Sequence, residues 1–255
     1  MPAAYAHLRF GRQVCLPGRY GRLAKNFPQL YHVGLQGPDP LFYHNPLATD
    51  AMHRLGTQLH LMTGQAFFTQ ALQAYRQAPS DGALAYLFGL LGHYCLDSRC
   101  HSLIDSLADD TASHTALETE FDRFLQQKDG CLRTQDRHTD KYIRLTRGER
   151  TTAAAFFPDV SPAAMGWGVG NMARIYRVSL SRKRWLSRLL MGLGGQQGLD
   201  MLPTVGPDPR CAHQNEKLLA CYDQAAADYP ALAQQLIQAL EDNTELGEAF
   251  LPIFG

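Results

Sequence analysis

The sequence lacks the usual features of exported and membrane-spanning proteins. Its first residues, MPAAYAHLRFGRQ, contain no apolar segment of the kind found in secretory signals. No run elsewhere approaches the roughly 18 apolar residues that a helix needs to span a bilayer. The six cysteines are scattered through 255 residues without a CxxC pair, which argues against a zinc ribbon and a disulfide scaffold. We therefore expect a cytoplasmic protein with reduced thiols.

The chain also lacks a net charge. Lysine and arginine together number 24, as do aspartate and glutamate, so no overall field draws the molecule to nucleic acid or to an acidic surface. Any attraction to an anionic partner must be local. Hydrophobic residues make up 45% of the chain and charged residues 19%, which excludes a disordered protein and allows a full core to be buried.

Strand signals are scarce, whereas helical patterns cover most of the chain. Apolar residues recur at three- and four-residue intervals in residues 63–78 and 214–243, and Ser80 is a candidate cap for a long helix that continues to residue 107. Ser161 followed by Pro162 indicates another helix start. Residues 32–46 and 192–212 are rich in glycine and proline and are predicted to be irregular. The sequence therefore predicts an all-α protein.

The helix predicted after Ser80 carries polar side chains where burial is expected. His93, Asp97 and His101 follow one another at four-residue steps and so lie along one stripe. An ionised aspartate among so many apolar residues is costly unless it is paired or binds a metal ion. Gly89 and Gly92 indicate that another backbone or a ligand approaches closely. Two interpretations stay open: a metal site, or an Asp97–histidine pair satisfied within the core or at the point where the helix meets solvent.

The distribution of the other histidines favours the metal site. Histidines and carboxylates without cysteine pairs are typical of catalytic zinc or a similar divalent ion. His114 and Glu118 repeat the four-residue interval, although a capping box formed by Thr115 and Glu118 would explain the glutamate without metal. Eight of the ten histidines fall within residues 1–114: His7, His32, His44, His53, His60, His93, His101 and His114.

Five motifs in this order resemble the zinc-dependent phospholipase C family, especially its shorter bacterial members without a signal peptide. They are PAAYAHLRFG, GLQGPDPLFYHNPL, LGTQLH, LGHYCLDSRCH and SHTALETEFDRFL, and HQNEKLLACYDQA resembles the family more loosely. The resemblance implies an all-α bundle that encloses a cluster of two or three zinc ions. It also implies that a metal-activated hydroxide cleaves the head-group phosphodiester of a phospholipid. We expect a metal-binding core at residues 1–160 and a helical extension at residues 161–255 packed on it.

The same resemblance implies a set of metal ligands. Asp39 would be a ligand or a catalytic residue that orients the attacking water. His53 is an alternative to His60, and His114 is a further alternative ligand. The secreted members also use a processed N-terminal amine, for which Pro2 would be available here after removal of Met1. The implied ligands are His7, Asp39, His60, His93, Asp97, His101 and Glu118.

Residues 174–193 have the pattern of a basic amphipathic helix. Such a helix can lie on anionic lipid, giving peripheral contact with the inner face of the membrane. A packed helix with a solvated basic side is the simpler alternative. The arginines that recur at helical spacing are Arg174, Arg177, Arg184 and Arg188.

Three functions fit these observations. The first is a zinc-dependent phospholipase C or a related enzyme that acts on a small phosphodiester. The second is a nuclease or phosphomonoesterase on the same metal architecture, and the third is a metal-binding protein without turnover. A nuclease should have aromatic stacking platforms and a basic groove. Because the charge is balanced and the basic stripe lies outside the metal motifs, nucleic acid is not the expected substrate.

Overall fold

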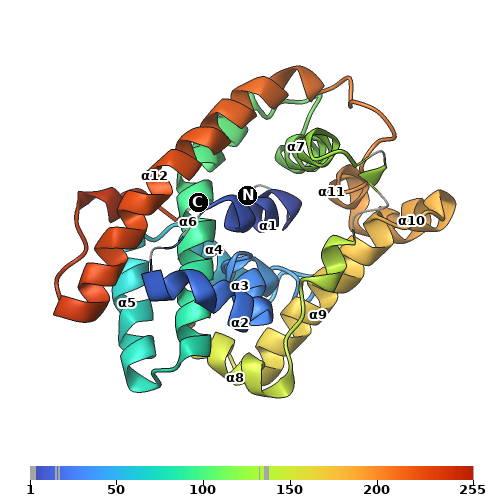
Figure 1. Ribbon diagram of the computed structural model, residues 1–255. Coiled ribbons are helices and arrows are strands. Elements are labelled where there is room, and N and C mark those ends of the chain that lie inside the picture. Colours follow the sequence, from blue (N-terminus) through green and yellow to red (C-terminus); the bar gives the residue numbers. More distant parts are fainter. Residues whose placement is uncertain (1–3, 15, 17, 132, 135–137, 255) are drawn as a thin grey trace.

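The computed structural model describes residues 4–14, 16, 18–131, 133–134 and 138–254 (Figure 1). Within these residues the chain forms helices and no strand, and an isolated bridge joins Thr63 to Ile253. The all-α prediction is confirmed. None of the helices in this part of the chain has the length and apolar character needed to cross a membrane.

The α-helices are α1 (Ala4–Gln13), α2 (Leu23–Asn26), α3 (Pro28–Gly34), α4 (Ala51–His60), α5 (Gly64–Gln77), α6 (Asp81–Leu107), α7 (His114–Lys128), α8 (Arg147–Ala154), α9 (Pro162–Ser179), α10 (Arg184–Met191), α11 (Gly195–Asp200) and α12 (Asn215–Asp242). The 3₁₀ segments are η1 (Gly18–Arg22), η2 (Asp39–Leu41), η4 (Thr139–Lys141), η5 (Gly192–Gly194), η6 (Ala212–Gln214) and η7 (Glu248–Phe250).

Helix α6 lies at the centre of the fold (Figure 1). Its N-cap is Ser80, as predicted, and the hydroxyl of Ser80 accepts a hydrogen bond of 3.1 Å from the amide of Ala83. Every residue from Gly82 to Asp97 is buried, because α1, α3, α5, α7 and α12 pack around this helix. A helix that is apolar on all sides needs such a complete cover.

Helices α3 and α6 touch through their backbones. A Cβ atom on Gly89 would lie 2.5 Å from the carbonyl oxygen of Tyr31 and 2.8 Å from the Cα of Gly34. One on Gly92 would lie 2.7 Å from a methyl group of Leu35. The expectation that another backbone approaches Gly89 is confirmed, whereas Gly92 faces a side chain.

Two segments predicted to be irregular contain helical turns. Residues 32–46 begin inside α3, which ends at Gly34, and they also include η2. Residues 192–212 contain η5 and the six-residue α11, Gly195–Asp200. Three of the six residues of α11 are Gly or Asp, which have weak helix propensity, so its sequence gives little sign of a helix.

The prediction of one helix over residues 174–193 was wrong. Helix α9 ends at Ser179, and α10 begins at Arg184. The side chains of α10 satisfy the carbonyl groups exposed by this break. Ser187 donates a hydrogen bond of 2.7 Å to the carbonyl of Val178, and Arg184 donates one of 3.3 Å to that of Ser179. Terminal carbonyls of a helix need such partners when water cannot reach them.

We expect Gly89→Ala to destabilise the protein by about 1–3 kcal/mol, because the new methyl group would overlap the backbone of α3. Gly170→Ala is the matched control: Gly170 lies inside α9, and its Cβ would have no heavy atom within 4 Å. Alanine there should leave stability unchanged or raise it by up to about 1 kcal/mol. Urea unfolding measures both changes, and equal effects would contradict the described packing of α3 on α6.

Candidate metal centre

Five side chains that are far apart in the sequence meet beside the middle of α6. His7 comes from α1, Asp39 from η2, His60 from the last residue of α4, and His93 and Asp97 from α6. All five are buried. Ligand-type atoms of His7, His93 and Asp97 lie within 4.8 Å of one another, as do those of Asp39, His60 and His93. The structure therefore brings together five of the seven implied ligands in one buried cluster.

Asp97 lies between His7 on one side and His60 and His93 on the other. Its Oδ1 is 3.3 Å from Nε2 of His7, and its Oδ2 is 3.1 Å from Nε2 of His93 and 4.0 Å from that of His60. Asp39 lies beside the same two histidines, with its Oδ1 3.2 Å from Nε2 of His60 and 3.8 Å from that of His93. A carboxylate such as Asp97, with one oxygen toward His7 and the other toward His93 and His60, is suited to bridge two cations.

The facing atoms of this cluster have no hydrogen-bond partner among the described residues. They are both ring nitrogens of His7, Nε2 of His60 and His93, Oδ1 of Asp39 and both carboxylate oxygens of Asp97. Leaving buried polar atoms unpaired costs about 1–3 kcal/mol each, and more for charged groups. So many in one place is unusual for a core that is merely satisfied by hydrogen bonds. The donor set of nitrogen and carboxylate oxygen is the one that zinc prefers.

Backbone carbonyls orient two of the imidazoles. Nδ1 of His60 lies 2.7 Å from the carbonyl oxygen of Gly56, and Nδ1 of His93 lies 3.2 Å from that of Leu35. When Nδ1 donates its proton to a carbonyl, the lone pair of Nε2 can bind a metal ion, which is the arrangement found in zinc sites. Gly37 has φ +54 and lies against His93, where a Cβ atom would be 2.2 Å from the ring. Glycine is required at this position for both reasons.

Burial and mutual charge shift the pKa values within the cluster. Burial opposes charge on His93, but the carboxylates of Asp97 and Asp39 raise its pKa. Burial also opposes ionisation of Asp97, yet the charge of His93 and the contact with His7 hold the pKa of Asp97 well below its usual range. Burial and the neighbouring His93 lower the pKa of His7. A proton on His93 and a metal ion compete for the same nitrogen.

A second group lies one turn further along α6. His101 Nε2 is 3.3 Å from Asp105 Oδ2, and His114 Nδ1 is 2.6 Å from Asp105 Oδ1. The other ring nitrogen of His114 lies 2.9 Å from Oε1 of Glu118. Burial lowers the pKa of His101 to about 4, and it raises the pKa of Glu118. His101, Asp105 and His114 could also hold a cation.

The structure separates the alternatives that the sequence left open. His114 lies in the second group, whereas the ring of His53 packs edge-on against Phe42 at 4.9 Å and His53 belongs to neither metal-type group among the described residues. The capping box at Thr115 was wrong, because Ser113 is the N-cap of α7 and accepts a hydrogen bond from the amide of Ala116. Glu118 is thereby left to face His114. Pro2 and the N-terminal amine lie outside the described residues.

A cleft of about 840 Å³ opens beside both groups. His60, His101, His114 and Glu118 are among the residues that line it. Its walls are mostly apolar and include Leu47, Leu61, Ile175, Leu180 and Leu190. The cleft therefore combines a mostly apolar lining with a few polar groups, which is the usual composition of a small-molecule site.

The comparison with known families gives one match: the family model described as zinc-dependent phospholipase C matches residues 6–164. The chain belongs to this family. Neither the curated proteins nor the solved structures contain a match to the chain. The matched span holds every histidine and carboxylate of the two groups described above, so the zinc that characterises zinc-dependent phospholipases C suits the donor atoms found here.

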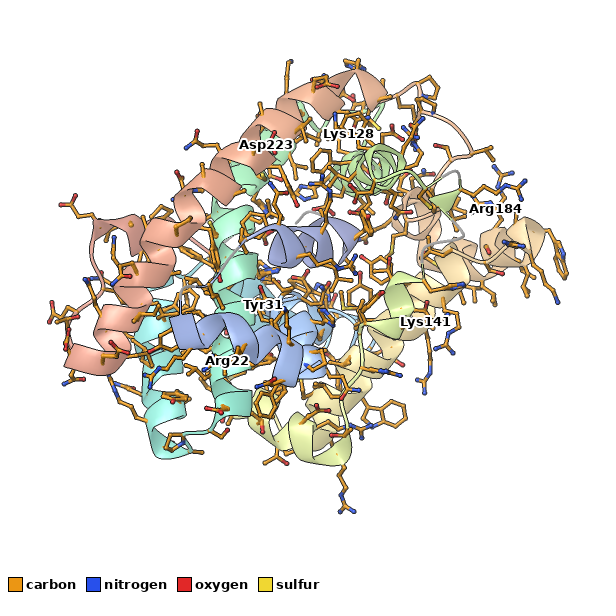
Figure 2. The ribbon with its side chains drawn as sticks, viewed as in Figure 1. Arg22, Tyr31, Lys128, Lys141, Arg184 and Asp223 are labelled. Carbon is orange, nitrogen blue, oxygen red and sulfur yellow. The ribbon has the colours of Figure 1, made fainter. Side chains whose placement is uncertain are left out.

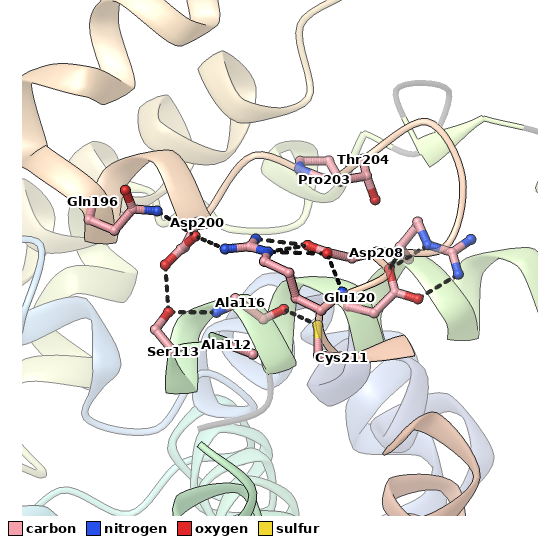
Figure 3. Close-up of polar contacts among 12 residues, drawn as sticks. Ala112, Ser113, Ala116, Glu120, Gln196, Asp200, Pro203, Thr204, Asp208 and Cys211 are labelled. Carbon is pink, nitrogen blue, oxygen red and sulfur yellow. Dashed lines mark hydrogen bonds and ion pairs between the residues drawn. The ribbon is translucent and has the colours of Figure 1, made fainter. Parts of the chain in front are cut away.

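Outside the family match, a network around Asp200 and Asp208 joins the C-terminal part of the chain to Ser113 and Glu120 (Figure 3). Arg210 holds the two aspartates together. Its guanidinium donates to Asp200 at 2.9 Å and to Asp208 at 2.8 Å. Asp200 accepts a 2.6 Å hydrogen bond from Ser113, the N-cap of α7 and the neighbour of His114. The amide of Asp208 donates to Glu120 on the same helix at 3.1 Å. The first turns of α7, which carry His114 and Glu118, are held in place by this network.

We expect Arg210→Met to lower the free energy of unfolding by about 1–3 kcal/mol, because two nearly buried carboxylates, Asp200 and Asp208, would lose their charged partner. Arg174→Met is the control, since the exposed Arg174 bonds only to Asn171 in the described part of the chain. That change should stay within about 0.5 kcal/mol. Hydrogen exchange should also quicken at the first turn of α7 in the Arg210 variant, and unchanged exchange there would contradict the role of the network.

Proposed function

We propose that this protein is a phospholipase C that uses zinc to hydrolyse the head-group phosphodiester of a phospholipid. One observation carries the proposal: buried histidine and carboxylate atoms without hydrogen-bond partners converge beside a cleft with apolar walls. Family membership supports zinc and phospholipid hydrolysis in general. The particular ligands, the number of ions and the substrate are our proposals.

We assign one set of ligands to each part of the centre. In the buried cluster, Asp39, His60, His93 and Asp97 would hold one ion, while His7 and Asp97 would contribute to a second. His101, His114 and Glu118 would hold a third, with Asp105 positioning the two imidazoles through its contacts with both. When bound, zinc supplies Lewis-acid chemistry: it favours ionisation of water near neutral pH and stabilises negative charge on phosphoryl oxygens.

The residues of the chain would orient the reactants. Asp39 is 4% exposed and lies on a 3₁₀ turn at the edge of the cluster, so its carboxylate can accept a proton from water that approaches the phosphorus or can bind metal directly. The apolar walls of the cleft would exclude bulk water around the phosphodiester and hold the acyl part of the lipid. Strong electrostatic interactions need such water-poor surroundings.

The charge of the cleft favours a phospholipid over nucleic acid. Among the described residues that line it, Arg123 is the one lysine or arginine, and two 2.7 Å hydrogen bonds join it to Glu120. A nuclease needs cations that can track several phosphates of a strand. A lipid presents one phosphodiester and two long apolar chains, which the exposed Leu47 and Leu61 beside the cleft would suit.

Asp97→Asn should lower the zinc content, because asparagine keeps the volume but removes the charge that a bridging ligand provides. Purified wild-type protein should carry two or three zinc ions per chain, and a chelator should lower its melting temperature, since metal bound to the native state stabilises it. Elemental analysis of protein prepared without a histidine tag measures the content.

Asp81→Asn is the control for this variant. It is the same substitution in the same helix, at an exposed position in the first turn of α6. Zinc content and melting temperature should match the wild type. If the Asp97 variant kept its full zinc content, Asp97 would not be a ligand, and a wild-type protein without zinc would contradict the whole centre.

We expect the protein to release a phosphorylated head group, such as phosphocholine, from soluble short-chain phospholipid. Activity should disappear with a chelator and return when zinc is added. Phosphorus NMR of the products separates cleavage on the glycerol side from other phosphodiester cleavage. Faster hydrolysis of single-stranded nucleic acid than of any lipid would move the assignment to a nuclease, and zinc binding without turnover of either would leave a metal-binding protein.

A further inference from the structure

Helix α10 exposes large apolar side chains to solvent. Trp185 is 71% exposed, Leu189 62% and Leu193, in the adjoining η5, 70%. Because these residues follow one another at four-residue steps, they form a stripe along one side of the helix. The helix projects at one edge of the molecule (Figure 1). We call Trp185, Leu189 and Leu193 the apolar stripe.

The surroundings of the apolar stripe are positively charged. Residues 160–199 contain six lysines and arginines and no aspartate or glutamate, although the whole chain has no net charge. Lys183 and Arg188 are exposed, and their side chains form no ion pair or hydrogen bond with the described residues. Such a combination of exposed tryptophan, leucine and cations is typical of helices that lie at a lipid interface.

Three of the four arginines in the sequence-based hypothesis are engaged elsewhere. Arg174 bonds to Asn171, and Arg177 pairs with Asp140 at 3.0 Å. Arg184, labelled in Figure 2, donates a 2.7 Å hydrogen bond to the carbonyl of Pro203. Arg188 is therefore the arginine of this set that stays available for a partner within the described structure.

The helix that carries the apolar stripe also borders the candidate active site. Leu190 and Met191, on the other side of α10, line the cleft. Leu47 and Leu61 also line it, and they are 73% and 66% exposed. A surface held by the apolar stripe would thus contact a helix that also lines the cleft.

We propose that the apolar stripe, with Lys183 and Arg188, docks this protein on a bilayer that contains anionic phospholipid. Trp185, Leu189 and Leu193 would enter the interfacial layer, while the two cations would contact lipid phosphates. That the partner is a phospholipid bilayer rests on the proposed phospholipase function. That the partner is negatively charged follows from Lys183 and Arg188 alone. A bilayer offers both parts of this surface a partner, since it presents anionic head groups above an apolar interior.

Vesicle binding tests this proposal with a readout other than hydrolysis. The probes are the zinc-loaded full chain with vesicles of phosphatidylcholine alone or of phosphatidylcholine mixed with phosphatidylglycerol. The wild type should bind the mixed vesicles at least tenfold more tightly, and salt should weaken this binding. Trp185→Ser combined with Leu189→Ser should lower the affinity at least tenfold, and Arg188→Glu severalfold, since each basic residue near an anionic surface contributes a factor of about 5. In the Trp167→Phe background, Trp185 fluorescence should shift to shorter wavelength on binding.

Trp167→Ser is the matched control, because Trp167 is also exposed, at 58%, but lies on α9. It should bind vesicles as the wild type does. The double variant should keep its zinc content and its hydrolysis of soluble short-chain lipid, which separates docking from the proposed activity. Unchanged vesicle binding by the double variant would overturn the proposal. The proposal would also be overturned if the wild type were a dimer in solution and the double variant a monomer. The apolar stripe would then bind a second copy of the chain.

Discussion

The carboxylate of Asp97 is the group on which the arrangement of this protein depends. It lies in a helix that is buried on every side, and imidazoles from α1, α4 and α6 itself surround it. A buried charge of this kind is tolerated only when opposite charges face it. The neighbouring helices therefore do more than cover α6 with apolar side chains. Three elements, α1, η2 and α4, must also place a polar side chain in the cluster around Asp97, and this requirement restricts their positions.

Much of the fold could be predicted from the sequence, because the signals were local. The Ser80 cap, the helical periodicity of residues 63–78 and the Ser161–Pro162 start all correspond to helix ends in the structure. Backbone contact at Gly89 was also predictable, since glycine in a helix interior needs a reason. The break between α9 and α10 was not, because tertiary hydrogen bonds from Arg184 and Ser187 stabilise it. The division of the chain at residue 160 stays a prediction.

The candidate site shows the same contrast. The four-residue steps from His93 to His101 indicated a metal site because helix geometry alone aligns them. His60 and His53 could not be separated by spacing, since the distinction depends on how α4 meets η2. For His114, the local pattern pointed to a cap at Thr115, whereas Ser113 has that role. The serine immediately before His114 was the signal that would have corrected this. Asp105, which contacts both His101 and His114, could not be found from spacing, because the contact with His114 joins α6 to α7.

One continuous helix, α6, carries residues of both candidate metal groups. His93, Asp97 and His101 are separated by a fixed rise of about 6 Å per step of four residues. Loops that hold metal ligands can adjust one ligand at a time, but a buried helix moves as a rigid rod. The distance between the two groups along α6 is thus set by the backbone hydrogen bonds of the helix. Only a bend in α6 between Asp97 and His101 would change that distance, whereas the polar side chains on α1, η2, α4 and α7 can be repositioned without moving α6.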